Sequence, residues 1–376
     1  MRNANMYDMN PFLIKTYKGP EYFFDRVEET KKLSDAIMNE RNLTLFSNRR
    51  LGKTSLIQHV FRQLDKSKYH PIFIDLFATQ NLAQFAQKVT EVVYKSKIIK
   101  EKIFFRILGS IGASLSFDEH SGIPKIDLNI VNRQKIIKGL PELFEQLKNT
   151  KKHNIILAFD EFQELAGYNE EKAEAYVRTI MQDCPEITFI FSGSKKSLMK
   201  EMFASSNRPF FQSTQMMELH EMDKDTYAKE IFSVLNNHNK LYDKDVIYSI
   251  LEETYCHTGF TQLVLSRVYS ESGEKIDDKL FKMIWEDILE ENRSLSREQE
   301  FLLPKLQWKV LVAIAKEEFV KAPLSRGFAD KYSLSASSSV ARAVKALLDK
   351  GLIIESGDLG LRVYNVFILK NLQKLY

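Results

Sequence analysis

The residues best suited to chemistry form one short polar stretch that ends in Gly52, Lys53 and Thr54. A β-prone run at 43–46 precedes this stretch, and apolar residues at helical spacing follow it. This order of strand, loop and helix is the context of a phosphate-binding loop, because N–H groups at the helix start point at the anion. Lys53 would contact the β- and γ-phosphates of ATP, and the Thr54 hydroxyl would hold Mg²⁺. The predicted nucleotide-binding residues are Ser47, Asn48, Arg49, Arg50, Leu51, Gly52, Lys53, Thr54 and Ser55.

The loop departs from the pattern G-x-x-x-x-G-K-[ST] at one position, where Ser47 stands in place of the first glycine. Serine adopts a positive φ less readily than glycine does. The alternative interpretation is an ordinary helix that starts at Lys53 and Thr54 after a surface loop. The strand–loop–helix context favours nucleotide binding.

A second acidic element follows about a hundred residues later, where the apolar run 154–159 ends in Asp160 and Glu161. A run that is apolar on both faces is typical of a central parallel strand, and ligands bind beyond the carboxyl ends of such strands. Asp160 would bind Mg²⁺ through a water, and Glu161 would polarise the water that attacks the γ-phosphate. The alternative is a pair of solvated acids at a strand end. Agreement between two separate motifs favours one shared site.

Four segments together resemble the archaeal-type ATPase family, a branch of the AAA+-like and STAND P-loop ATPases. They are Phe24–Arg26, Asn48–Leu56, Phe159–Gln163 and Phe191–Ser194. The resemblance covers about residues 10 to 370. It implies an α/β fold with the parallel sheet of P-loop NTPases, followed by a helical lid and a C-terminal winged-helix domain.

The resemblance also implies further site residues. Ser192 or Ser194, after the strand 187–191, would sense the γ-phosphate, although either residue is also a simple helix cap. Arg208 is the candidate arginine finger, and the alternative is an ordinary surface arginine. Phe24 and Arg26 are candidates for the edge of the adenine pocket, and Phe24 is equally suited to anchor the core.

The string at 256–262 resembles a family segment between lid helices, although the proline of that segment is absent. His257 or Thr258 would approach the nucleotide. A helix cap around Gly259 explains the string as well.

The length of 376 residues suggests two or three domains. We expect a P-loop ATPase core at 1–221, a helical lid at 222–298 and a winged helix at 299–376, with a polar linker at 291–299. Alternating residues at 113–117 and 125–130, with a turn at 120–124, predict a β-hairpin insert of no assigned function.

The C-terminal segment combines three predicted helices with a hairpin, which is the pattern of a winged helix. Residues 301–376 hold 12 Lys and Arg against 6 Asp and Glu, whereas the whole chain carries only +4. Ser337, Arg342 and Lys345 lie away from the apolar face of the third helix and are candidates to contact double-stranded DNA. The alternative is a protein partner, because winged helices also serve as protein docking modules.

Composition excludes several classes. Two cysteines, without metal-ligand spacing, rule out a disulfide framework and fit a reducing, cytoplasmic compartment. The polar residues 1–10 lack the apolar region of a signal peptide, and we expect no membrane span.

The main hypothesis is therefore an ATPase that hydrolyses ATP to ADP with Mg²⁺ and reports its nucleotide state through the winged helix. The second is a STAND-type regulatory switch with little turnover. The third is a DNA-binding regulator whose phosphate loop is only a structural relic.

Overall fold

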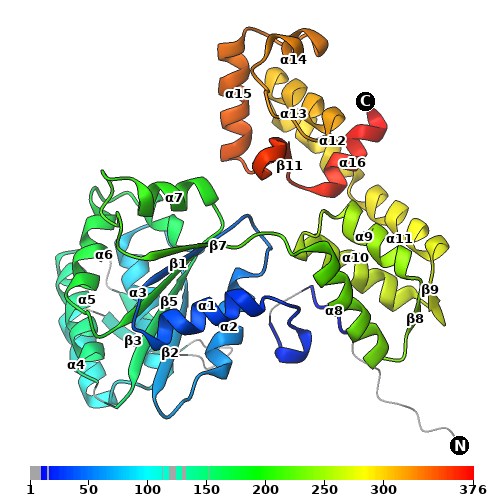
Figure 1. Cartoon of the computed structure of the whole chain (residues 1–376). Helices are drawn as coiled ribbons and strands as arrows, with labels where there is room; N and C mark the ends of the chain where they lie inside the picture. The colour runs from blue at the N-terminus through cyan, green and yellow to red at the C-terminus, as the bar shows by residue number, and fades with distance from the viewer. Residues whose placement is uncertain (1–9, 15–16, 112, 118–123, 129–132, 151) are drawn as a thin grey trace, which may run out of the picture. The chain divides into compact units, whose positions relative to one another are not determined.

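A computed structural model of the chain describes residues 10–14, 17–111, 113–117, 124–128, 133–150 and 152–376. It forms two compact units, of which the first is Tyr17–His220 and the second comprises residues 10–14 and Glu221–Tyr376 (Figure 1). The segment considered for a signal peptide lies outside the described residues except for Asn10. Among the helices of the described ranges, none is both long and apolar enough to cross a membrane.

The first unit is built on a five-stranded parallel sheet with the strand order β2-β5-β6-β1-β7. The strands are β1 (Leu43–Phe46), β2 (Tyr69–Asp75), β5 (Asn154–Asp160), β6 (Thr188–Gly193) and β7 (Gln215–Glu218). Phe46, the last residue of β1, pairs with Gly193 on one side and Glu218 on the other. The carboxyl ends of β1, β5 and β6 therefore meet at one edge, as the predicted P-loop NTPase fold requires.

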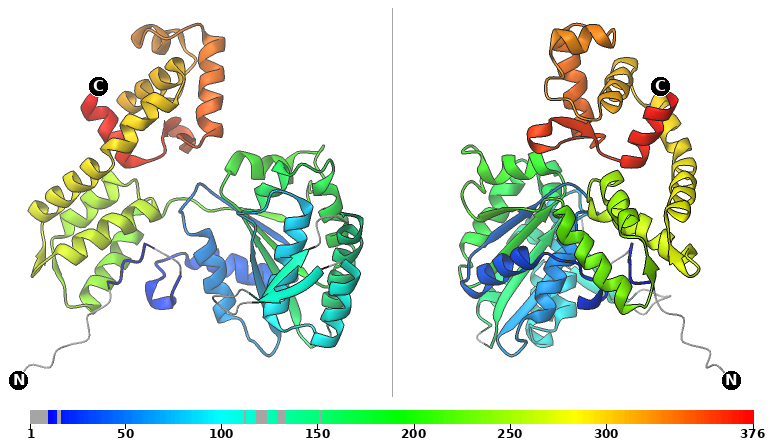
Figure 2. Two further views of the ribbon diagram at one scale, coloured as in Figure 1. Left: turned by 180° about the vertical axis from the view of Figure 1, so that it is seen from behind. Right: turned by 45° about the vertical axis from the view of Figure 1, so that its right-hand side comes forward.

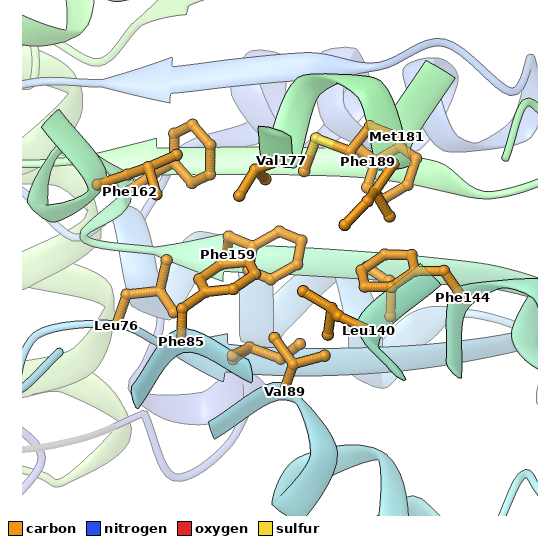
Figure 3. Packing of buried hydrophobic residues seen from close by; sticks show 14 of the residues in the cluster. Leu76, Phe85, Val89, Leu140, Phe144, Phe159, Phe162, Val177, Met181 and Phe189 are labelled. Carbon is orange, nitrogen blue, oxygen red and sulfur yellow. The ribbon is translucent and has the colours of Figure 1, made fainter. Parts of the chain in front are cut away.

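Helices cover both faces of this sheet (Figures 1 and 2). They are α1 (Val27–Met38), α2 (Lys53–Gln63), α3 (Leu82–Ser96), α5 (Arg133–Lys148), α6 (Ala173–Gln182) and α7 (Lys196–Ala204). Alternate residues of β5 enter different cores: Leu157 and Phe159 pack with α3, α5 and α6, whereas Ile156 and Ala158 pack with α1 and α2. Phe159 lies beside Phe85 of α3 (Figure 3). The centroids of the two rings are 5.7 Å apart. Burial on both faces explains the continuous apolar run in the sequence.

The insert between β2 and β5 contains α4 (Glu101–Ile111) and a separate antiparallel pair, β3 (Ala113–Phe117) and β4 (Pro124–Leu128). The predicted hairpin is thus confirmed in its strands. Its turn lies outside the described residues apart from Pro124.

The second unit begins with helices α8 (Lys224–Asn237), α9 (Lys244–Glu253), α10 (Thr258–Glu271), α11 (Asp278–Glu291) and α12 (Arg293–Leu302), and a short pair, β8 (Leu241–Tyr242) and β9 (Lys275–Ile276). The predicted linker at 291–299 is wrong, because most of it belongs to α12. That segment is polar but has no glycine or proline, so nothing in it stops a helix. The proposed boundary between residues 298 and 299 falls inside α12.

The C-terminal part contains the helices and the hairpin of a winged helix. These elements are α13 (Lys305–Glu317), α14 (Arg326–Lys331), α15 (Ser337–Asp349), β10 (Ile353–Glu355), β11 (Leu361–Val363) and α16 (Val366–Leu375). The strands pair antiparallel, and Val320 adds a bridge to Leu361. The short helical turn η3 (Gly357–Leu359) forms the tip of the wing. The helix α16 was not predicted, because its apolar start reads as a continuation of the strand.

Candidate nucleotide-binding site

The Lys53 ammonium group is buried inside the loop that joins β1 to α2. Lys53 is the first residue of α2 and its exposed fraction is 5%. Its Nζ donates to Ser47 Oγ at 3.1 Å and to the Asn48 carbonyl at 3.1 Å. Burial lowers the pKa of Lys53 to about 8, and the carboxylates of Glu161 and Asp160 oppose this shift. A desolvated cation whose direct hydrogen-bond acceptors are neutral is suited to receive an anion.

The loop backbone accommodates serine at its first position. Ser47 is not among the described residues with a positive φ, whereas Arg50 and Gly52 have φ values of 55° and 97°. The position therefore does not require glycine. A Cβ at Gly52 would meet no atom within 4 Å, which means that the backbone there faces open space. That opening is the approach that a phosphate needs.

Arg26 supports the loop from the side. Its Nη2 donates to the Leu51 carbonyl at 3.3 Å, and its Nη1 pairs with Glu29 at 3.0 Å. Arg26 and Phe24 are both buried. The structure thus places Arg26 against the phosphate loop, and its approach to an adenine ring stays a prediction.

Asp160 lies at the end of β5 and collects donors from three elements. The Thr54 hydroxyl donates to its Oδ2 at 2.5 Å, and the Ser192 hydroxyl from β6 donates to its Oδ1. The Glu161 backbone N–H also donates to Oδ1, at 3.1 Å. The two predicted Mg²⁺ ligands, Thr54 and Asp160, are therefore in contact.

Glu161 follows in a left-handed backbone conformation, with a φ of 53°, at the start of the turn η2 (Phe162–Gly167). For a residue with a side chain this conformation costs about 1 kcal/mol, and such strain gathers at functional sites. The Ser194 hydroxyl donates to Glu161 Oε2 at 2.6 Å, and the Gln163 amide donates to the same oxygen. The predicted base and the predicted sensor thus touch.

Arg208, the candidate arginine finger, forms ion pairs with acidic side chains of two helices. Arg208 pairs with Glu174 of α6 at 3.1 Å and with Glu201 of α7 at 3.6 Å. Burial raises the pKa of Glu174, and Arg208 opposes that rise. The arginine therefore has local counter-ions, and its role as a finger stays a prediction.

His257 belongs to the second unit, where it is fully buried. Its side chain caps α10 by accepting from the Phe260 N–H, and its Nε2 lies 3.4 Å from the Tyr364 hydroxyl. Thr258 is the first residue of α10. Helix capping accounts for the string at 256–262.

Sequence reasoning missed Gln163 as a site residue and missed the charge cluster on Glu218. The only sequence signal for Gln163 is its position two residues after Glu161, within the segment Phe159–Gln163 that resembles the family. Glu218 ends β7 beside Phe46 and pairs with Lys196 and with Lys200, the latter at 3.2 Å. No sequence pattern predicts β7, because this strand is short and only partly buried.

The third helix of the winged helix presents a polar face. Ser337, Ser338, Arg342 and Lys345 of α15 are exposed, whereas Val340, Ala343, Val344 and Leu347 of the same helix are buried. The candidate DNA contacts of the sequence analysis thus share the solvent side of one helix.

Comparison with known proteins identifies the family. A family model described as "ATPase domain predominantly from Archaea" matches residues 23–253. The chain belongs to this family. A second model, described as "Probable winged helix domain", matches residues 297–374.

Solved structures agree on the fold of this family member. The Walker-type ATPase of Pyrococcus abyssi has 18% identity and a TM-score of 0.67, covering 96% of this chain and 99% of that one. The ORC2 protein of Aeropyrum pernix has 13% identity and a TM-score of 0.62, covering 98% of this chain and 96% of that one. No curated protein sequence matches the chain.

Proposed function

We propose that this chain binds ATP with Mg²⁺, hydrolyses it to ADP and phosphate, and passes its nucleotide state to the winged helix. One observation carries the proposal: a buried lysine, a Thr–Asp pair and a Glu–Ser pair meet at the carboxyl ends of β1, β5 and β6. Each pair joins residues that are far apart in the sequence, from Thr54 to Asp160 and from Glu161 to Ser194. Membership of an ATPase family supports the same reaction.

The donor set fits Mg²⁺. Thr54 and Asp160 offer a hydroxyl and a carboxylate oxygen, the hard ligands that this ion prefers, and phosphate oxygens and waters would complete its shell. Among the described residues no cluster of three or more His, Cys, Asp or Glu is arranged to hold a metal by itself. That agrees with an ion carried in largely by the nucleotide. When bound, Mg²⁺ would neutralise charge on the β- and γ-phosphates.

The remaining steps belong to residues of the chain. Loop N–H groups and Lys53 would bind the phosphates, with Lys53 exchanging the Asn48 carbonyl for a phosphate oxygen. Ser194 would donate to the γ-phosphate or to the attacking water. Glu161 would take the proton of that water as it attacks the γ-phosphorus, and the bond from that phosphorus to the leaving ADP oxygen would break.

The test is phosphate release from ATP by the full chain with Mg²⁺, with and without duplex DNA. We expect turnover in the wild type and a loss of roughly a hundredfold or more in Glu161→Gln. The matched control is Glu171→Gln, an exposed glutamate ten residues further along the chain. Equal turnover in Glu161→Gln and the wild type would contradict the assignment of the base.

A second candidate function is a nucleotide-dependent switch of the STAND type with little turnover. Its specific support is Arg208, whose guanidinium is engaged by Glu174 and Glu201 and would have to leave both to reach a phosphate. Tight binding of ATP with no phosphate release in any condition would favour this function.

The partner of the winged helix is proposed to be duplex DNA, contacted through Ser337, Arg342 and Lys345, or a protein. The exposed polar face of α15 and the basic excess of residues 301–376 support DNA. The wing tip supports a protein, because its residues include Asp358 and the exposed Leu359 but no Lys or Arg.

The two cysteines are free and buried, which supports a cytoplasmic location.

A further inference from the structure

Gln163 is a buried amide in the middle of the candidate active site. Its exposed fraction is 2%, and it lies in the turn η2 that follows Glu161. Its Oε1 accepts from the Ser194 backbone N–H at 3.2 Å. Its Nε2 donates to Glu161 Oε2 and, at 3.3 Å, to Glu164 Oε1.

These contacts allow only one orientation of the amide. A backbone N–H can only donate, so the atom that it contacts must be the carbonyl oxygen of Gln163. The NH₂ group must then face the two carboxylates, which can only accept. Gly193 leaves room for this arrangement, because a Cβ there would lie 2.4 Å from Gln163 Oε1.

Glu161 receives two donors on a single oxygen. The Gln163 amide and the Ser194 hydroxyl both contact Oε2, which leaves Oε1 as the oxygen able to accept from a water. Gln163 also holds the backbone of Ser194. Glu161, Gln163 and Ser194 therefore form a closed hydrogen-bonded cycle, in which the Gln163 amide contacts both the carboxylate of the base and the backbone of the sensor.

We propose that Gln163 is a positioning residue that orients the Glu161 carboxylate toward the attacking water. This inference rests on the proposed hydrolysis. A general base must lie within hydrogen-bond reach of the proton it removes, and a carboxylate tied at one oxygen has its second oxygen pointed in a fixed direction. Gln163 would not touch the nucleotide, so it would act on turnover and not on ATP binding.

The test uses Gln163→Leu, which keeps the approximate size but cannot hydrogen bond. We expect kcat to fall roughly tenfold or more, within the range that general-base catalysis contributes, while the Kd for a fluorescent ATP analogue stays within about twofold. Gln182→Leu, an exposed glutamine at the end of α6, is the matched control. Gln163→Met is the second variant: its unbranched side chain keeps the length of glutamine but cannot donate to Glu161, so the same loss in kcat is expected even if Gln163→Leu does not fold.

A double-mutant cycle separates positioning from a structural role. Single-turnover hydrolysis is measured for Glu161→Gln alone and combined with Gln163→Leu or Gln163→Met. We expect the double variants to hydrolyse ATP at the same rate as Glu161→Gln alone. A residue that acts only by orienting the Glu161 carboxylate has no effect once that carboxylate has been replaced.

Three outcomes would overturn the inference alone. They are an unchanged kcat in both Gln163 variants, an increased kcat in either variant, and an equal factor of decrease in the hydrolysis rate whether position 161 is Glu or Gln. A wild type without turnover, or one unaffected by Glu161→Gln, overturns the proposed hydrolysis and this inference with it. Normal turnover in the wild type together with normal turnover in the Gln163 variants leaves the proposed function standing.

Discussion

Replacing Lys53 by methionine tests whether the buried ammonium group lowers the stability of the fold and contributes to ligand binding. Burial lowers the pKa of Lys53 from 10.5 to about 8. Each pKa unit corresponds to about 1.4 kcal/mol, so keeping Lys53 charged in the folded chain at pH 7 costs roughly 3 kcal/mol. Methionine fills similar space without charge. We therefore expect Lys53→Met to raise the free energy of unfolding by up to about 3 kcal/mol at pH 7.

The pH dependence gives this prediction its sign. The pKa of Lys53 is lower in the folded chain than in the unfolded chain, so the unfolded chain binds the proton more tightly at intermediate pH. As the pH rises from 8 to 10.5, folded Lys53 loses its proton first and the wild type becomes more stable. The advantage of Lys53→Met should therefore shrink to about 1 kcal/mol at pH 10.

The assay is urea unfolding followed by circular dichroism at both pH values, with the exposed Lys66→Met as control. The same variant should bind ATP roughly tenfold to a hundredfold more weakly, because it loses charge-assisted hydrogen bonds to phosphate. A Lys53→Met chain that is less stable than the wild type at pH 7, yet binds ATP normally, would refute the reasoning.

Three further predictions concern other charged groups. Asp160→Asn should abolish the difference between ATP affinities measured with Mg²⁺ and with a chelator, because the metal loses its carboxylate ligand. Arg208→Ala should lower the free energy of unfolding by roughly 1–3 kcal/mol, since it leaves Glu174 buried without its counter-ion, and adding Glu174→Gln should restore most of that loss in urea unfolding. The double variant Arg342→Ala/Lys345→Ala should weaken duplex DNA binding and reduce the slope of log affinity against log salt by about 2, whereas an unchanged slope would favour a protein partner.

The core of the site was predictable because its signals are local. A phosphate loop is a strand, a turn and a helix start in succession, so Lys53 and Thr54 could be placed from neighbouring residues alone. The run at 154–159 is apolar on both faces of the sheet, which indicates a central parallel strand. Asp160 and Glu161 follow this run, so they could be placed at the carboxyl end of that strand. Parallel pairing then brings these ends together.

What could not be predicted depends on packing between distant segments. The strand β7 has four residues and only one buried side chain, so no alternation in the sequence marks it. The partners of Arg208 come from two helices that only the tertiary fold brings close. Gln163 follows an acid at a spacing found in many loops, and its function is visible only once Ser194 lies beside it. The helix α12 was not predicted because the segment 291–299 is almost entirely polar, which resembles a linker, although it contains no glycine or proline.

The groups that would act on a nucleotide already have hydrogen-bonding partners within the protein. Lys53 donates to Ser47 and Asn48, Thr54 donates to Asp160, and Ser194 donates to Glu161. Binding would therefore exchange protein contacts for phosphate and metal contacts, and only the difference between the two sets would appear as affinity. Among these residues, Lys53 should gain the most binding free energy from the exchange. Its present acceptors are neutral, whereas its hydrogen bonds to a charged phosphate would be stronger. The Thr54–Asp160 pair must open to admit a metal, whereas the contact between Gln163 and Glu161 can persist through catalysis. Affinity would then depend mainly on Lys53, and turnover on Glu161 and the Gln163 amide that stays in contact with it.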